Sequence, residues 1–209
     1  MDFNDTPEEA KFRKEAYDWL KANAPLKEGP KDSWRAASEE EGLKEVKAWQ
    51  KKLHDGGWAC LHWPKQYGGR ESTPIERVIW GQEVSKFKVP GGYLEIGQGM
   101  AGPVMMMYAT EEQKERYLPP LATGEEIWCQ LFSEPAAGSD VAGIKTKAEL
   151  DGDTWTINGQ KVWTSGAHFS DYGILVTRSD PTVAKHKGLT FFFVDMKSPG
   201  IEVKPIKQI

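Results

Sequence analysis

The spacing of apolar residues changes once along the chain, and the change separates a helical part from a β part. In the first part apolar side chains recur every three or four residues, so that Phe12, Ala16 and Leu20 share one helix face. In the second part the period falls to two, as in strands that bury one face. This pattern predicts a helical domain over residues 1–126 and a β domain over residues 127–209.

Capping residues mark where the expected helices begin. Thr6 and Thr73 each precede a proline and stand three residues before a glutamate, which is the arrangement of a capping box. Ser38 begins a further helix, and Thr110 begins a short one that we expect Pro119-Pro120 to end. These local signals predict four of the helices before any tertiary contact is considered.

A fifth helix is expected in the stretch that ends at Ala109. It is apolar nearly all round, which predicts a position inside a helix bundle. Its Met105–Met107 run either lines an adaptable apolar tunnel or fills the core. The Gly97–Gly102 segment matches the dinucleotide pattern G-x-G-x-x-G, but no apolar strand leads into it and Pro103 follows at once. Close helix packing explains these glycines better than a nucleotide site.

The β part predicts short strands joined by tight turns. Asp151-Gly152-Asp153 and Asn158-Gly159 are typical hairpin turns, and the Leu189–Val194 run is apolar enough to be buried on both faces. Helices followed by strands predict an α+β fold, with an all-α helical bundle before an antiparallel β-barrel or sandwich. After a first strand near Ile127, the expected strands are Lys145–Leu150, Thr154–Ile157, Gln160–Thr164, Tyr172–Thr177, Leu189–Val194 and Ile201–Ile206. Because the last one stops with the chain, we expect a piece of a longer protein.

Composition excludes several classes of protein. Among the 209 residues, 27 Lys and Arg face 31 Asp and Glu, and the net charge of −4 argues against a general nucleic-acid binder. The 9 Trp, 6 Tyr and 8 Phe are too many aromatic residues for a disordered chain. The longest apolar stretch, Met100–Ala109, is too short to span a bilayer, and the acidic start lacks a targeting pattern. We therefore expect a cytoplasmic protein without a membrane span.

Neither a metal site nor a hydrolase triad is expected. Cys60 and Cys129 stand far apart, and the four histidines form no HExxH motif and no ligand spacing with either cysteine. Ser165, His168 and Asp171 lie too close along the chain to be trusted as a triad, and Ser165 is not in a G-x-S-x-G elbow. The chemistry of this chain has to be sought in other motifs.

Two segments of the β part have unusual chemistry. The Trp128–Asp140 segment leaves a strand and turns through small residues, exposing N–H groups and two hydroxyls that suit a polar heterocycle and then a phosphate. The Asn158–Ala167 segment places the aromatic Trp163 two residues from the hydroxyl of Ser165. The residues alone leave two interpretations open, which are a sandwich corner with an aromatic core plug and a ligand-binding surface.

The motifs in these segments resemble those of the acyl-CoA dehydrogenase family. The resemblance covers essentially the whole chain and implies the family's fold, in which a helical domain and a middle β domain precede a C-terminal four-helix domain. This chain matches the first domain and most of the second, and it lacks the third. The resemblance rests on SEPAAGSD (133–140), DGDTWTINGQKVWTSGA (151–167), GILVTRSDP (173–181), GWACLHWPKQYGG (57–69) and TEEQKERYLPPL (110–121).

The resemblance implies FAD as a non-covalent cofactor that lies against the β domain. By position, the Gln130–Ser139 stretch wraps the isoalloxazine ring and reaches the pyrophosphate, Trp163 packs by the ring edge, and Ser165 donates near flavin N5. Ser133 and Ser165 stand where threonine is commoner in the family, which retains the hydroxyl and loses a methyl group. The implied cofactor contacts are Gln130, Leu131, Phe132, Ser133, Gly138, Ser139, Trp163, Thr164 and Ser165, and Ser139 is also implied to bind the thioester arm of the substrate.

The implied activity is α,β-desaturation of an acyl-CoA thioester, an oxidoreductase step of fatty acid and lipid metabolism. The family's proton acceptor is a glutamate of the C-terminal domain, expected beyond Ile209, so no catalytic residue is assigned here and the isolated chain is expected to be inactive. The implied partners are an acyl-CoA, an electron-transfer flavoprotein or similar acceptor and, at full length, further copies of the chain in a dimer or a homotetramer.

Other members of the same fold stay open as alternatives. One is an acyl-CoA oxidase or flavin monooxygenase, which oxygen reactivity of the reduced protein separates from a dehydrogenase. Another is a non-catalytic structural subunit of a hetero-oligomeric acyl-CoA dehydrogenase. A DNA-associated member is a further alternative, although no basic patch in the sequence supports it.

Overall fold

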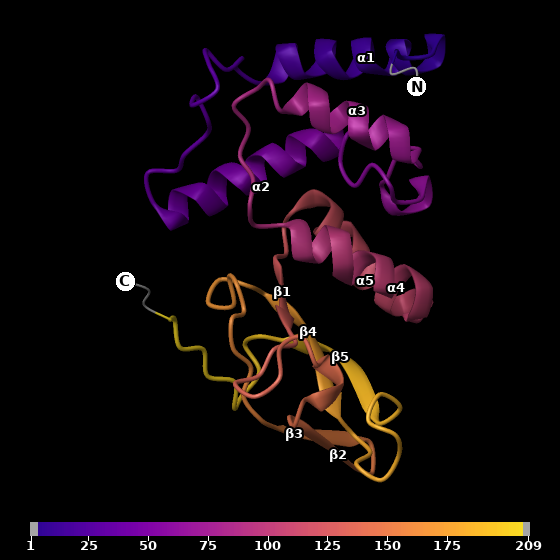
Figure 1. The fold of residues 1–209 in the computed structure, drawn as a ribbon, viewed down its shortest axis with the longest axis vertical. Helices are drawn as coiled ribbons and strands as arrows, with labels where there is room; N and C mark the ends of the chain where they lie inside the picture. Colours follow the sequence, from indigo (N-terminus) through magenta and orange to yellow (C-terminus); the bar gives the residue numbers. More distant parts are fainter. Residues whose placement is uncertain (1–3, 207–209) are drawn as a thin grey trace. The chain divides into compact units, whose positions relative to one another are not determined.

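The computed structural model describes residues 4–206 and divides them into two compact units (Figure 1). The helical unit comprises the chain up to Tyr93 together with Gly102–Glu125, and the β unit comprises Leu94–Ala101 and the chain from Glu126 onward. This order of helices and strands confirms the α+β fold class. None of the helices within the described range is long and apolar enough to cross a membrane.

The first three helices begin where their capping residues predict. Thr6 and Thr73 each form a complete capping box with the glutamate three residues on, and the Ser38 hydroxyl accepts a hydrogen bond from the third N–H of its helix. Each cap satisfies backbone donors that the helix itself leaves unpaired. The helices are α1 (Pro7–Asn23), α2 (Glu39–Asp55) and α3 (Pro74–Val84).

An aromatic cluster holds α1 against α3. Phe12 of α1 and Ile79 of α3 belong to one buried cluster with Trp58. The indole of Trp58 stacks on that of Trp80, with 4.7 Å between ring centroids, and the Arg70 guanidinium lies 4.1 Å from the Trp58 ring centroid. The predicted inward face of α1 is therefore confirmed as a core face.

The expected buried helix ends one residue before Ala109 and is buried on one side. Gly97–Ala101 forms a π-helical turn, and α4 spans Gly102–Tyr108. Met105 is fully buried, whereas Met107 and Tyr108 are 71% and 77% exposed. The prediction of burial all round is wrong, because α4 packs on α5 with one face and a helix so packed buries only that face.

Close packing is confirmed for one glycine of the G-x-G-x-x-G match. A Cβ added at Gly102 would lie 2.1 Å from the indole of Trp63, a side chain with no exposed surface. Such a distance is far below van der Waals contact, so only glycine fits there without moving Trp63. At Gly99 an added Cβ would meet nothing within 4 Å, and the structure gives no packing reason for that glycine.

Helix α5 (Glu111–Thr123) continues through the two prolines that were expected to end it. Pro119 and Pro120 lack the N–H groups that would bond to the preceding turn, but their carbonyls and fixed φ angles are compatible with the last turn of a helix. Leu118 and Leu121, on either side of them, are 1% exposed, so tertiary packing holds this turn helical. The helix ends at Gly124, which adopts the left-handed conformation with φ +77°.

The β unit contains one five-stranded sheet arranged around β4. Strand β4 pairs with β5 in antiparallel fashion along its whole length, with β1 in parallel, and with β2 in parallel at its last residue, while β2 and β3 form an antiparallel hairpin. The sheet is thus open and mixed, which corrects the expectation of a closed or purely antiparallel one. The strands are β1 (Trp128–Leu131), β2 (Lys147–Asp151), β3 (Thr154–Asn158), β4 (Tyr172–Arg178) and β5 (Leu189–Asp195).

Three strand predictions were wrong. Residues 160–164 form no strand, because the backbone N–H of Val162 bonds to the loop after β1 instead of to a neighbouring strand. Residues 201–206 have no ladder partner among the described residues. The strand buried on both faces is β4, whose residues 173–177 are all buried. Within the described range β5 pairs with β4 alone, and it is half-buried. A strand at the edge of a sheet has fewer neighbours to cover it.

Candidate functional site

The structure brings the two motif segments of the β unit together. Strand β1 leads into a loop that contains Ser133, and the carbonyl of Ser133 accepts a 2.9 Å hydrogen bond from the N–H of Val162. The ammonium of Lys161 donates a 3.0 Å bond to the carbonyl of Phe132. Because 29 residues separate the partners of these bonds, only tertiary folding places the Trp163 segment beside the loop.

Glu134 anchors the loop after β1. Its backbone exchanges two hydrogen bonds with Ala137, which closes a tight turn, and its carboxylate accepts bonds from the N–H groups of Lys145 (2.7 Å) and Thr146 (2.9 Å). The Lys161 ammonium completes the set at 2.9 Å. Burial by itself raises the pKa of Glu134, but hydrogen bonds from Thr146, Lys145 and Lys161 outweigh it and lower the pKa to about 2. A carboxylate so engaged is a weak base, and its role is to fix the turn.

The Trp163 segment is strained and open to solvent. Trp163 adopts the left-handed conformation with φ +59°, and its side chain is 67% exposed. The hydroxyl oxygen of Thr164 is buried and has no hydrogen-bond partner among the described residues. A large residue held at positive φ, an exposed indole and an unsatisfied buried hydroxyl seldom persist without a use. The expectation of an aromatic core plug is therefore wrong for Trp163, which presents its ring to solvent.

The remaining sequence-predicted site residues belong to the same two segments. Phe132 packs edge-on to Phe191, with 6.2 Å between ring centroids, and lies against a buried cluster that contains Ala137 of the same loop. At Gly138 an added Cβ would meet nothing within 4 Å, so no packing contact explains the glycine and the space beside its backbone is open. The half-buried members of the set are Gln130, Leu131, Phe132, Ser133 and Thr164, and the exposed ones are Gly138, Ser139, Trp163 and Ser165.

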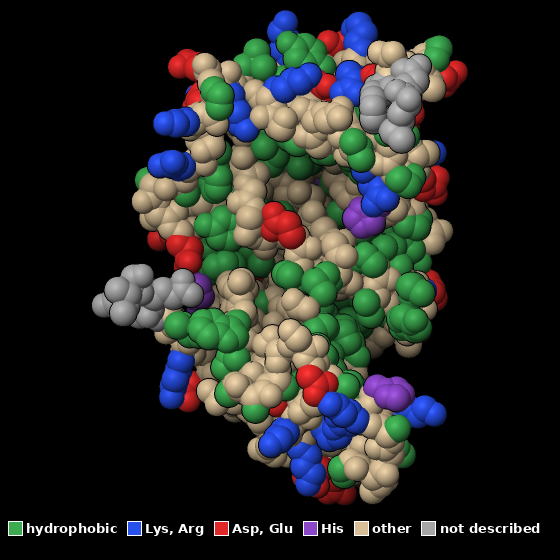
Figure 2. Space-filling view, viewed as in Figure 1, with side chains coloured by type: hydrophobic (Ala, Val, Ile, Leu, Met, Phe, Trp, Pro, Cys, Tyr) green, Lys and Arg blue, Asp and Glu red, His purple; other side chains and the backbone are tan. Residues whose placement is uncertain are grey.

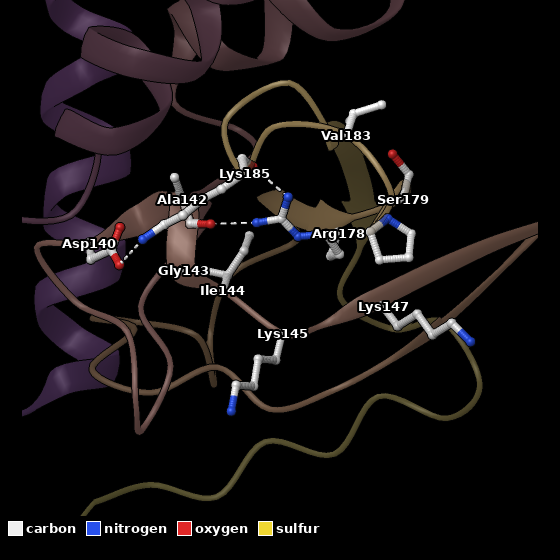
Figure 3. A pocket seen from close by; sticks show the side chains of 11 residues that line it. Asp140, Ala142, Gly143, Ile144, Lys145, Lys147, Arg178, Ser179, Val183 and Lys185 are labelled. Carbon is white, nitrogen blue, oxygen red and sulfur yellow. Dashed lines mark hydrogen bonds and ion pairs between the residues drawn. The ribbon is translucent and has the colours of Figure 1, made fainter.

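A pocket of about 670 Å³ begins one residue after Ser139 (Figure 3). Arg178, at the end of β4, donates to the carbonyls of Ala142 and Lys185, which ties the neighbouring loop to the short helical turn after Ser139. Lys185 pairs with Asp140, the one acidic residue in the lining. The lining comprises Asp140, Ala142, Gly143, Ile144, Lys145, Lys147, Arg178, Ser179, Pro181, Val183 and Lys185.

The pocket lining is strongly basic. Four of its side chains are Lys or Arg against a single Asp, and basic side chains gather at the end of the β unit where β2 and β3 lie (Figure 2). The sequence assigned no role to these residues. A signal was present, because Lys145 and Lys147 stand two apart at the start of a strand and therefore on one face of it.

Comparison with known proteins identifies the class to which this combination of a helical unit, a β unit and paired motif segments belongs. Residues 6–125 match the family model of the acyl-CoA dehydrogenase N-terminal domain, and residues 129–209 match that of the middle domain. The chain belongs to the acyl-CoA dehydrogenase family, as its motifs indicated.

Curated relatives and solved structures agree with this assignment. Acyl-CoA dehydrogenase IpdE1 of Mycobacterium tuberculosis is 40% identical over 171 residues, which cover 82% of this chain and 44% of the relative. Acyl-CoA dehydrogenase FadE34 of the same organism is 45% identical over 174 residues, which cover 83% of this chain and 24% of the relative. The ChsE4-ChsE5 complex from that organism has a TM-score of 0.76 at 29% identity over 100% of this chain and 52% of that one. The Tcur3481-Tcur3483 steroid ACAD has a TM-score of 0.76 at 32% identity, and the match covers 96% of this chain and 50% of that one. The chain thus spans about half the length of these relatives, or less.

Proposed function

We propose that this protein is an FAD-dependent acyl-CoA dehydrogenase and that the present chain supplies the surface on which the flavin lies. The supporting observation is the junction of the two motif segments, where an exposed Trp163 and the unsatisfied hydroxyl of Thr164 lie beside the loop after β1. When bound, FAD supplies an acceptor for the hydride that leaves the β-carbon of the substrate.

The residues present fit such a cofactor. A flat heterocycle needs an aromatic neighbour and hydrogen-bond donors, which Trp163 and the hydroxyls of Ser133 and Ser165 provide. A pyrophosphate needs backbone that it can approach closely, and the open space at Gly138 permits that approach. Donors directed at the ring stabilise the negative charge that it gains on reduction.

The α-proton acceptor is proposed to come from outside residues 4–206. Glu134 is buried and committed to three hydrogen bonds, which removes it from contact with a substrate. Asp140 is exposed and forms an ion pair with Lys185. A general base has to reach the substrate carbon and be held away from competing partners, and both carboxylates of the motif segments are already paired.

The basic pocket is proposed to receive the phosphate groups of the acyl-CoA. It starts next to Ser139, the residue that the family places at the thioester arm, and its volume of about 670 Å³ lies in the range of small-molecule and cofactor sites. We expect CoA to bind more weakly to a Lys145→Ala/Lys147→Ala variant, and calorimetric titration at two salt concentrations measures this. Equal affinity in the variant would contradict the assignment.

The flavin assignment is tested on the complete gene product. We expect flavin absorbance bands in the wild type and a dissociation constant for FAD about tenfold higher in Trp163→Ala. In Ser165→Ala we expect flavin reduction to be one to two orders of magnitude slower, because the variant loses about 1.5–3 kcal/mol of hydrogen bonding to the charge that develops on the ring. Trp155→Ala, which removes a partly exposed Trp from β3, is the control and leaves both quantities unchanged. Absence of flavin bands even with added FAD refutes the proposal.

A second candidate is a non-catalytic subunit of a hetero-oligomeric acyl-CoA dehydrogenase. The observation in its favour is that one structural relative is described as a complex of two proteins, ChsE4 and ChsE5. Activity of the purified complete gene product with a panel of straight-chain, branched and steroid-ring acyl-CoA thioesters separates the two functions. A catalytic enzyme turns over at least one of them with an electron-transfer flavoprotein or an artificial acceptor, and a structural subunit turns over none. The same preparations show by their mass in solution whether the protein forms a homo-oligomer.

A further inference from the structure

A charged pair among the described residues of the β unit is withdrawn from solvent, and the proposed chemistry does not use it. The side chains of Lys161 and Glu134 are 8% and 7% exposed, and their Nζ and Oε1 atoms lie 2.9 Å apart. Other ion pairs of the β unit, such as Lys197 with Asp171, leave at least the lysine well exposed. A buried pair is costly to desolvate and commonly adds little net stability over an apolar pair. A gain in stability over an apolar pair therefore does not account for its presence.

The pair sits where three segments converge. Glu134 belongs to the loop after β1 and accepts N–H bonds from Lys145 and Thr146, at the entrance to β2. Lys161 stands two residues before Trp163 and also donates to the carbonyl of Phe132. The neighbouring bond from Val162 N–H to Ser133 runs beside the ion pair. The loop that carries Ser133 and the segment that carries Trp163 are thus bonded to each other within two residues of these proposed flavin contacts.

We infer that the Lys161–Glu134 ion pair is a positioning clamp, which sets the distance and angle between the loop that carries Ser133 and the segment that carries Trp163 to Ser165. This inference rests on the proposed function, since the two walls matter together only if one ligand touches both. The ammonium donates to the Phe132 carbonyl as well as to Glu134, and the carboxylate also accepts two backbone N–H bonds, so the pair defines an orientation that an apolar contact does not. It also opposes relaxation of the left-handed backbone at Trp163.

The alternative is a pair that serves only the stability of the β unit, and a double-variant cycle separates the two roles. Removal of one charge leaves the other buried and unpaired, so Lys161→Met and Glu134→Gln are each expected to lower the urea midpoint. The double variant Lys161→Met/Glu134→Gln removes both charges and is expected to recover most of that midpoint. If the pair positions the two segments, the double variant stays defective in flavin binding although its stability is recovered. If the pair serves stability alone, the double variant behaves like wild type.

The experiment uses the complete gene product with three readouts. We expect the double variant to bind FAD at least tenfold more weakly than wild type, to change the visible circular dichroism of the bound flavin, and to exchange the Val162 amide hydrogen at least tenfold faster when free of flavin. Lys197→Met, which removes the exposed member of an ion pair in the same unit, is the matched control and leaves all three unchanged.

The outcomes distinguish this inference from the proposed function. Wild-type FAD affinity, flavin spectrum and Val162 exchange in a double variant of recovered midpoint overturn the clamp. A wild-type protein that binds no FAD overturns the proposed function. In that case the exchange rate of the Val162 amide hydrogen in the double variant still tests the clamp, because it is measured without flavin. If the double variant does not fold, Lys161→Arg retains the charge with a wider, planar donor fork. It is expected to keep the urea midpoint and to alter both the flavin spectrum and the exchange rate, and no change in either overturns the inference.

Discussion

Acidification is expected to remove a defined part of the stability of the β unit through Glu134. The pKa of this carboxyl is about 2 in the folded protein, because three donors outweigh the effect of burial, against an ordinary value of 4.5. The lowered pKa corresponds to roughly 3 kcal/mol of stabilisation, since one unit of pKa is worth about 1.4 kcal/mol. Because the folded pKa is lowered, this stabilisation is present in full above pH 4.5 and is lost as the pH falls from 4.5 towards 2.

The measurement is the free energy of unfolding in urea for wild type and Glu134→Gln at pH 7 and pH 3. At pH 3 only about 1 kcal/mol of the Glu134 contribution is left, so the difference in unfolding free energy between the two proteins should narrow by roughly 2 kcal/mol. Other carboxyl groups titrate in both proteins and cancel in the difference. Replacement of the exposed Glu149 by Gln is the control, with an effect below about 0.5 kcal/mol. A gap of equal size at both pH values refutes the reasoning.

Two further outcomes are expected in the rest of the chain. Gly102→Ala should lower the free energy of unfolding in a urea titration by about 1–3 kcal/mol, since its Cβ would lie 2.1 Å from the buried Trp63. Gly81→Ala should raise it by about 0.5–1 kcal/mol in the same titration, because this position of α3 is exposed and an added Cβ meets nothing within 4 Å. Cys60, whose pKa burial raises to about 12, and Cys129, whose pKa burial also raises, should react with an aromatic disulfide reagent at pH 8 only as fast as the protein unfolds. Rapid reaction of either thiol in the native protein contradicts this prediction.

The sequence by itself determined the features that depend on neighbouring residues. The capping boxes at Thr6 and Thr73 begin their helices because a hydroxyl and a carboxylate within one turn satisfy backbone donors, whatever the rest of the chain does. The change of apolar period separated helices from strands for the same reason, since the period follows from local geometry. The two motif segments were recognisable because the resemblance lies in contiguous runs of residues.

Only the tertiary structure decided how distant segments meet. Helix α5 continues past Pro119 because buried leucines on either side of the prolines hold the turn, and no local signal records that packing. The alternating residues of 160–164 looked like a strand, but Lys161 and Val162 bond to the loop after β1 instead. The partnership of Lys161 with Glu134 joins residues 27 apart, and it becomes favourable only when folding excludes water from both charges and surrounds them with donors and acceptors.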